Sequence, residues 1–341
     1  LLMLPIAARS GSATSFSDAL FTATSAVCVT GLVIHDTATY WSVFGQGIIL
    51  LLIQIGGMGI VTIAVSIAAV SGRKIGLMQR STMQEAIAAP NVGGIVRRTK
   101  FILKTAISVE LIGAAVLAPV FCRDFGFFKG IWYALFHSIS AFCNAGFDII
   151  GDGKSMLSYR HDPLVLCTLA ILVAIGGLGF IVWEDIIAKK SWKRLNVYSK
   201  VIILAQIFFI VVGTFVYFIL EYGNINTIGA ESVGQKILAS FFQSVTTRTA
   251  GFDALIQNNL TDLSKAWGTV LMMIGGASGS TAGGVKLGTA VLVIMTLISV
   301  LRGKSDYSRQ KNCTHDYSSS NGIACIVACA CCGRFGAYKL Y

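Results

Sequence analysis

The sequence predicts an all-α integral membrane protein built from repeated helical units, and three observations carry this prediction. Hydrophobic residues make up 55% of the 341 residues and charged residues 13%. Together with a mean hydropathy of +0.73, these values exclude an ordinary soluble domain or a disordered chain. Long apolar runs alternate with polar segments. A short motif ending in glycine occurs three times, which indicates internal repeats.

The repeated motif predicts a half-helix followed by an extended turn. It reads SDALFTATSAVCVTGL at 17–32, WYALFHSISAFCNAGF at 132–147 and ILASFFQSVTTRTAGF at 237–252. Each copy holds about twelve helix-compatible residues, fewer than the roughly 20 that cross a bilayer. Superposed without gaps, the copies share an alanine (Ala19, Ala134, Ala239), a phenylalanine (Phe21, Phe136, Phe241) and a glycine (Gly31, Gly146, Gly251).

The apolar runs predict the membrane helices. They cover residues 48–70, 101–121, 164–187, 201–220 and 267–301, and their lengths fit the roughly 20 residues of a membrane span. Residues 1–8 are also apolar, with no basic leader before them. We interpret them as the remnant of a cut-off transmembrane helix rather than as a signal peptide.

The basic residues are distributed by membrane side. The formal net charge is +11, and Lys and Arg concentrate at 73–104, at 189–200 and at Arg302 and Lys304, whereas residues 33–44 contain neither. The positive-inside rule places these basic segments in the cytoplasm and the glycine turns near the outer face. This distribution disfavours nucleic acid as a partner. A solvated basic face and one that meets anionic lipid or an acidic partner both stay open.

A second shared mark completes the repeated unit. The sequences IGGMG at 55–59, IGGLG at 175–179 and IGGAS at 274–278 each follow one glycine turn on an apolar run. The predicted unit is therefore helix, half-helix, glycine turn, helix. The chain then divides into 1–70 (first unit), 71–100 (basic connector), 101–188 (second unit), 189–199 (cytoplasmic loop), 200–304 (third unit) and 305–341 (Ser- and Cys-rich tail).

The glycine turns predict a cation site made of backbone oxygens. A half-helix directs the partial negative charge of its C-terminus toward the turn, which favours a cation. Non-helical backbone is tolerated at membrane depth where it lines a polar cavity, and its carbonyls can replace the water around an ion. The predicted ligands are the carbonyl oxygens of Cys28, Val29, Thr30 and Gly31, of Cys143, Asn144, Ala145 and Gly146, and of Arg248, Thr249, Ala250 and Gly251.

Polar residues near the turns need separate interpretation. Because a positive charge facing the ion would oppose conduction, we expect Arg248 to point backward, toward a carboxylate. Glu110 lies inside an apolar run and is either functional, close to a helix end or paired with a neighbouring repeat. We expect His137 to be packed or hydrogen-bonded. Acidic residues outside the turns either concentrate cations at the entrance or are solvated loop residues: Asp36, Asp148, Asp152, Asp253 and Asp262.

The last apolar run is interrupted by GGASGSTAGGVK at 275–286. A phosphate-binding loop is disfavoured because Val285 displaces the required lysine and no strand precedes it. A fourth glycine turn at 280–283 is disfavoured because the glycine pair at 275–276 already aligns with the second helix of the unit. We expect a gate formed by Gly275, Gly276, Ala277, Ser278, Gly279, Ser280, Thr281, Ala282, Gly283, Gly284 and Lys286.

The nine cysteines do not predict a disulfide framework or an enzyme site. Cys28, Cys122, Cys143 and Cys167 lie in or beside apolar segments and are interpreted as small buried hydrophobic residues. The remaining five follow residue 312 without the paired spacing of zinc sites, which disfavours a metal-binding tail. No nucleophile, base and orienting group occur together in the sequence. We expect no enzymatic activity and no organic cofactor.

Four segments of the sequence resemble the Trk/Ktr/HKT superfamily. These are TSAVCVTGL at 24–32, SAFCNAGF at 140–147, TTRTAGF at 246–252 and GASGSTAGGVK at 276–286. Over residues 1–304 the similarity is greatest to its KtrB-type potassium-translocating membrane subunits. The resemblance implies four units around a central pore, K⁺ uptake across the bacterial plasma membrane, often dependent on Na⁺, a homodimer and a cytosolic KtrA-type nucleotide-binding ring. It assigns the selectivity glycines to Gly31, Gly146 and Gly251 and the gating loop to 275–286.

Two alternatives remain open from the sequence. A secondary cation transporter with broken helices would bind its substrate at the half-helix ends and rock its repeats against one another. In the other alternative, the chain is a non-conducting membrane subunit. A fourth repeat would be expected after Lys304, whereas the tail is rich in Ser and Cys, as truncation or a shifted reading frame would produce. Three of the four repeats would then leave one quadrant of the filter without carbonyls.

Overall fold

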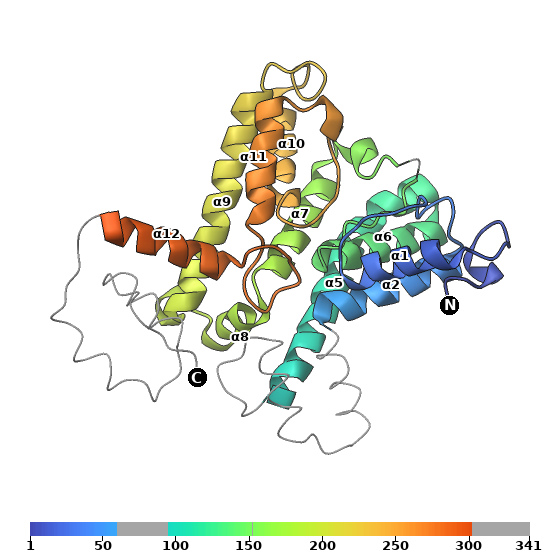
Figure 1. Cartoon of the computed structure of the whole chain (residues 1–341), viewed down its shortest axis with the longest axis horizontal. Coiled ribbons are helices and arrows are strands. Elements are labelled where there is room, and N and C mark those ends of the chain that lie inside the picture. The colour runs from blue at the N-terminus through green and yellow to red at the C-terminus, as the bar shows by residue number, and fades with distance from the viewer. Residues whose placement is uncertain (60–94, 152, 302–341) are drawn as a thin grey trace.

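The structure, a computed structural model, describes residues 1–59, 95–151 and 153–301, and these ranges are helical with no β-sheet (Figure 1). The α-helices are α1 (Phe16–Val27), α2 (Val43–Met58), α5 (Ile95–Phe125), α6 (Phe127–Phe142), α7 (Pro163–Gly177), α8 (Phe180–Lys189), α9 (Val197–Glu221), α10 (Val233–Thr246), α11 (Asp262–Met273) and α12 (Leu287–Leu301). Short 3₁₀-helices are η1 (Pro5–Ala7), η2 (Leu157–Tyr159), η3 (Trp192–Arg194) and η4 (Gln257–Asn259). Most of the predicted basic connector and the predicted tail lie outside the described residues.

Two described helices are long and apolar enough to cross a membrane. They are the spans Val96–Phe125 in α5 and Val197–Glu221 in α9, which confirm the helices expected at 101–121 and 201–220. A third span is present if α7 and α8 are taken together, although the chain bends by 97° between them. The half-helices α1, α6 and α10 contain 12, 16 and 14 residues, so each is shorter than a bilayer-spanning helix.

Two helix predictions were wrong. Residues 164–187 were expected to form one continuous helix, but α7 ends at Gly177 and α8 starts after Gly179, which has a φ of +86°. Such a left-handed conformation is accessible to glycine and breaks the helix. Residues 1–8 were expected to be the remnant of a helix, yet they contain only the 3₁₀ turn η1, since so short a segment cannot offset the cost of helix nucleation. Of the helix expected at 48–70, the described part ends at Met58.

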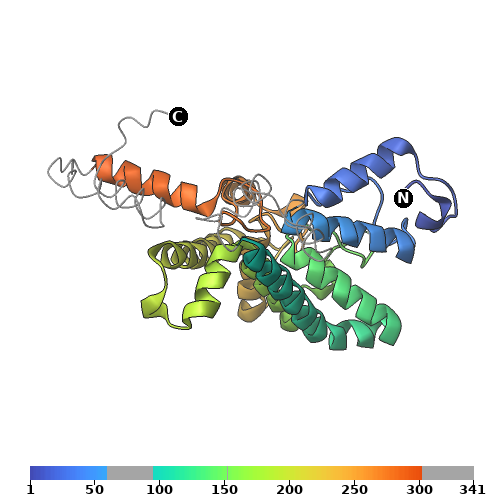
Figure 2. The same cartoon turned by 90° about the horizontal axis from the view of Figure 1, so that it is seen from below.

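Packing is organised by helix pairs that meet at a common centre. Contacts join α1 with α2, α5 with α6 and α9 with α10, and further contacts join α6 with α7 and α7 with α10. Figure 2 shows the helices spreading outward from a central region, into which the segment between α11 and α12 runs. The helix that follows each glycine turn begins at a capping side chain, namely Ser42 for α2, Asp162 for α7 and Thr261 for α11. Each cap bonds backbone amides of the first turn and so fixes the helix start.

His137 is part of the packed interior. It is 0% exposed and its ring lies near those of Phe121, Phe136 and Phe252. Its Nδ1 donates to the Tyr133 carbonyl at 2.7 Å, and its Nε2 accepts the amide of Ile149 at 3.4 Å. The interpretation of this residue as a packed, hydrogen-bonded histidine is confirmed.

Candidate functional site

The three glycine turns share one backbone conformation. In each turn a non-glycine residue with positive φ lies two positions before a glycine with positive φ: Val29 (55°) and Gly31 (80°), Asn144 (56°) and Gly146 (70°), Thr249 (70°) and Gly251 (82°). For an L-residue the left-handed region costs roughly 1–2 kcal/mol. Strain of this kind recurs at functional sites, where the surrounding structure holds it in place.

The turns also touch one another in sequence order. A Cβ atom added to Gly31 would lie 2.5 Å from the Ala145 carbonyl oxygen, and one added to Gly146 would lie 2.7 Å from the Ala250 carbonyl oxygen. Only glycine leaves room for backbone at this distance. Three segments more than a hundred residues apart in the sequence are therefore brought to one place, with the turn at 143–146 between the other two.

Hydroxyl groups that the sequence analysis missed fix each turn to its half-helix. Ser25 Oγ donates to the Leu32 carbonyl at 2.7 Å, Ser140 Oγ to the Phe147 carbonyl at 2.7 Å, and Thr246 Oγ1 to the Phe252 carbonyl at 2.6 Å. Each bond ties the last turn of the half-helix to the residue after the glycine. The signal was present in the first two copies, where a serine occupies the same place in the motif.

The third copy shows why that signal was incomplete. Thr246 lies one position later in the motif than Ser25 and Ser140, so its half-helix is shifted by one residue relative to the ungapped superposition. Burial agrees, because Phe242 (1% exposed) rather than Phe241 takes the interior position that Phe136 (0%) has in the second copy. The third half-helix therefore departs from the ungapped superposition at its hydroxyl and its buried phenylalanine, whereas Ala239, like Ala134 1% exposed, keeps the shared position.

The glycine pairs let the second helix of a unit pack against the end of its half-helix. A Cβ added to Gly56 would clash with the carbonyl of Val27, and one added to Gly176 with the carbonyl of Phe142. The Cys143 side chain lies on Gly57 of the preceding unit, where an added Cβ would be 2.6 Å from its sulfur. Cys143 is buried as expected, Cys122 and Cys167 are partly buried, and Cys28 is exposed, which corrects the expectation for Cys28.

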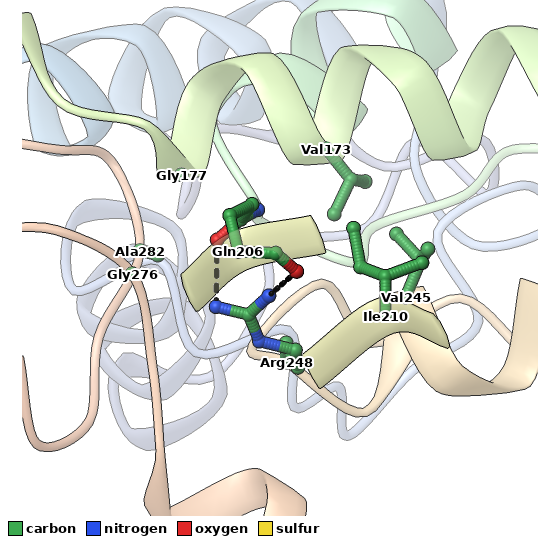
Figure 3. A pocket seen from close by; sticks show the side chains of 8 residues that line it. All are labelled: Val173, Gly177, Gln206, Ile210, Val245, Arg248, Gly276 and Ala282. Atoms are coloured by element: carbon green, nitrogen blue, oxygen red, sulfur yellow. Dashed lines mark hydrogen bonds between the residues drawn. The ribbon is translucent and has the colours of Figure 1, made fainter. Parts of the chain in front are cut away.

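Arg248 points away from the turn, but its partners differ from the prediction. Its Nη2 donates to Gln206 Oε1 at 2.7 Å and to the Gly275 carbonyl at 3.0 Å, and its side chain lines a small cavity (Figure 3). The expected carboxylate is replaced by an amide oxygen and a backbone oxygen. Both acceptors have free lone pairs, so the buried guanidinium is hydrogen-bonded without a counter-ion among the partners recorded for it.

Glu110 pairs with a neighbouring unit. Gln54 Nε2 of α2 donates to both carboxylate oxygens, at 2.9 and 3.0 Å, and Glu110 is 3% exposed. Ser138 Oγ of α6 donates to the backbone carbonyl of Glu110 at 2.6 Å. Of the interpretations left open for Glu110, pairing between repeats is the one that the structure supports.

The interrupted segment lies between α11 and α12 and forms hydrogen bonds with the second and third copies of the repeated motif. Ile274 and Val285 form an isolated parallel bridge, so the segment folds back on itself. Gly275 accepts from Arg248 of the third turn, and Thr281 Oγ1 donates to Phe142 O at the end of α6 at 2.9 Å. The interrupted segment is thus attached to the third turn and to the end of the half-helix that precedes the second turn.

Acidic residues lie in the loops that follow the turns. Burial raises the pKa of Asp148 to about 6, and the charges of Asp36 and Asp253 add to this increase. Asp253 is half-buried, its pKa is also raised by burial, and Gln257 donates to it at 2.9 Å. Asp262 is exposed at the start of α11, and Asp152 lies outside the described residues.

Comparison with known proteins assigns this apolar, helical architecture to the class of all-α integral membrane transporters. The model of the TrkH family, described as "Cation transport protein", matches residues 2–315. The potassium/sodium uptake protein NtpJ of Enterococcus hirae is 39% identical over 89% of this chain and 67% of its own length. The Ktr system potassium uptake protein B of Bacillus subtilis is 40% identical over 90% of this chain and 68% of its own length.

The fold agrees with this assignment. The crystal structure of the potassium transporter TrkH from Vibrio parahaemolyticus superposes with a TM-score of 0.65 at 20% identity, over 93% of this chain and 62% of that chain. This chain belongs to the TrkH family of cation transport proteins. Members of the family are transporters and not enzymes, which confirms the expected absence of enzymatic activity.

Proposed function

We propose that this chain takes up K⁺ through a filter formed by the carbonyl oxygens of residues 28–31, 143–146 and 248–251. The observation that carries the proposal is the shared turn conformation, in which two residues with positive φ flank one residue without it in all three turns. Alternation of this kind can direct successive carbonyl oxygens to one side of the chain. Contact between the turns would bring these oxygens around one ion.

The energetics of the site favour a cation that has lost its water. The half-helices α1, α6 and α10 each end at a turn, so their C-terminal partial negative charges add at this place. Carbonyl oxygens would replace the hydration shell. The outer acidic residues Asp36, Asp148 and Asp253 would raise the local cation concentration at the entrance.

The interrupted segment at 275–286 would act as the gate. Five glycines lie within residues 275–284, and Gly279 and Gly284 have positive φ values of 65° and 68°. A segment of this composition can change conformation at low cost. Its position beside Phe142 and Arg248 would let it obstruct the path below the turns.

Assembly and location are inferred from the relatives. Two relatives are named as Ktr system potassium uptake protein B, a name that implies a system with more than one component. We infer a homodimer in the bacterial plasma membrane with its basic loops in the cytoplasm, bound there by a KtrA-type nucleotide-binding ring. Na⁺ dependence is inferred from the potassium/sodium name of the Enterococcus hirae relative.

A non-conducting membrane subunit is the second candidate, and one observation favours it. Residues 28–30, 246–247 and 249–251 line a hollow of about 440 Å³ together with Gly56, Met272 and the proposed gate residues 281–283. An ion held by these two turns would face this hollow on one side. No observation in the described residues favours the secondary cation transporter whose repeats rock against one another.

Complementation of a K⁺-uptake-deficient bacterium tests the proposed function. We expect the chain to restore growth at low millimolar K⁺, and Gly146→Ser to reduce this growth while raising sensitivity to Na⁺. A rocking carrier would instead show altered substrate affinity and coupling in the same variant. Absent rescue, with the chain present in the membrane fraction by immunoblot, would contradict K⁺ uptake and favour the non-conducting subunit.

A further inference from the structure

The gate segment is bonded directly to the second filter turn through one side chain, Thr281. Its Oγ1 donates to the Phe142 carbonyl at 2.9 Å, and Asn144 Nδ2 donates to the same Oγ1 at 2.9 Å. Thr281 and Asn144 are 8% and 2% exposed. The hydroxyl also occupies the space that a Cβ at Gly176 would need, at 2.7 Å.

Asn144 is the residue through which this contact reaches the proposed ion site. It adopts the left-handed conformation with a φ of 56°, which is strained for most L-residues and tolerated by asparagine. Its side chain leaves the turn toward the gate segment, whereas its backbone carbonyl belongs to the predicted ligands. The corresponding residues of the other turns are Val29, which has no hydrogen-bonding side chain, and Thr249, whose Oγ1 is buried without a recorded partner.

The gate segment also completes a helix break in the second unit. The amide of Ala277 donates to the Gly177 carbonyl at 2.9 Å, and the amide of Thr281 donates to the Gly176 carbonyl at 3.3 Å. In return, the amide of Phe180 at the start of α8 donates to the Gly279 carbonyl at 2.8 Å. These bonds satisfy the backbone groups that the bend between α7 and α8 leaves free, so the segment has a defined docked position.

We propose that Thr281 is a positioning residue that couples the gate to the second filter turn, an inference that rests on the proposed function. When the segment is docked, Thr281 holds Asn144 and the end of α6 in the geometry that binds K⁺. When the segment leaves, Asn144 loses the partner of its amide group and the Phe142 carbonyl loses a donor. Coupling between two sites is reciprocal. Hence K⁺ in the filter stabilises the docked segment as much as the docked segment stabilises bound K⁺.

Hydrogen–deuterium exchange of the purified chain tests this reciprocity without requiring transport. The amides of Ala277 and Thr281 report docking, because they bond to α7. For the wild type we expect K⁺ to slow their exchange about three- to tenfold relative to Na⁺, the factor that one net hydrogen bond provides. Thr281→Val should abolish this K⁺ effect, and Thr281→Ser should retain it.

Ser280→Ala is the matched control. Ser280 is the neighbouring hydroxyl, and the hydrogen bond that its Oγ makes among the described residues stays within the segment, to the Ala277 carbonyl at 2.6 Å. It should alter the baseline exchange but leave the K⁺ effect in place. If Thr281→Val does not give a monodisperse folded protein, Thr281→Ala removes the same hydroxyl without the added methyl group.

Calorimetric titration with K⁺ and with Na⁺ separates the two levels of inference. Wild-type protein that binds K⁺ in preference to Na⁺, together with a K⁺ effect that survives in Thr281→Val, would overturn the coupling and leave the proposed function intact. K⁺ binding without any K⁺ effect on the wild-type segment would overturn it as well. Wild-type protein without K⁺ preference would contradict the proposed filter itself.

Discussion

Replacement of Gly146 by alanine perturbs the contact between the second and third turns of the proposed filter most directly. Gly146 has a φ of +70°, and an added Cβ would lie 2.7 Å from the Ala250 carbonyl oxygen and 3.0 Å from the Gly251 Cα. The left-handed conformation costs an alanine roughly 1–2 kcal/mol. The clash with backbone atoms that cannot rotate away adds about 1–3 kcal/mol.

These two effects set the expected magnitude for Gly146→Ala. If a strain of roughly 2–5 kcal/mol displaces the filter carbonyls, K⁺-over-Na⁺ discrimination should fall at least about 30-fold, since ~1.4 kcal/mol corresponds to a factor of ten. The assay is Rb⁺ uptake into vesicles in competition with Na⁺, with Rb⁺ as the tracer for K⁺.

Gly11 offers a control with nearly the same backbone angle. Its φ is +69°, and an added Cβ would meet nothing within 4 Å. Gly11→Ala therefore carries the conformational cost alone, and we expect a stability loss of roughly 1–2 kcal/mol with unchanged discrimination. Equal discrimination in Gly146→Ala and the wild type would refute the assignment of this turn to the filter.

Three further predictions follow from the site. Because the carboxyl of Asp148 has a pKa of about 6, it is charged above that pH and neutral below it. Uptake should therefore fall as the external pH drops from 7 to 5, and Asp148→Asn should flatten this pH profile. A profile that is the same in Asp148→Asn and the wild type would contradict a role of Asp148 in attracting cations. Ser140→Ala removes one hydrogen bond from the second turn, worth about 1 kcal/mol, and should lower K⁺-over-Na⁺ discrimination about fivefold. Ser138→Ala is the control: it removes a hydrogen bond of similar strength to α5 and should lower only the melting temperature. Arg248→Lys replaces two donor nitrogens, Nη1 bonded to the Gln206 carbonyl and Nη2 bonded to Gln206 Oε1 and the Gly275 carbonyl, by a single ammonium group. It should destabilise the chain by about 1–3 kcal/mol in thermal unfolding, and a melting temperature equal to that of the wild type would contradict this role.

Apolar composition and repeated glycine marks were sufficient to predict the helical membrane architecture. The runs at 101–121 and 201–220 became α5 and α9 because their length and hydropathy leave few alternatives. The run at 164–187 wrongly suggested one continuous helix, because hydropathy alone does not reveal the break between Gly177 and Gly179. That break depends on bonds to Ala277 and Gly279, almost a hundred residues later in the sequence.

The conformation of the three turns could be predicted from their glycines, but the side-chain contacts around them could not. Glycines in equal register indicated the three turns, because positive φ values favour glycine. The partner of Arg248 could not be predicted, since Gln206 comes from another helix and Gly275 bonds through its backbone oxygen. The link from Thr281 to Asn144 spans 137 residues and leaves no local pattern. The one-residue shift of the third half-helix was hidden because Phe241 and Phe242 are adjacent.

Anomalous diffraction from crystals of this chain grown with Rb⁺ or Tl⁺ measures the central claim most directly. The account predicts an ion peak where the turns at 28–31, 143–146 and 248–251 meet, within coordinating distance of backbone oxygens from at least two turns. Soaking into Na⁺ should remove the peak. An empty junction between the turns, with the ion bound elsewhere or nowhere, would contradict the account.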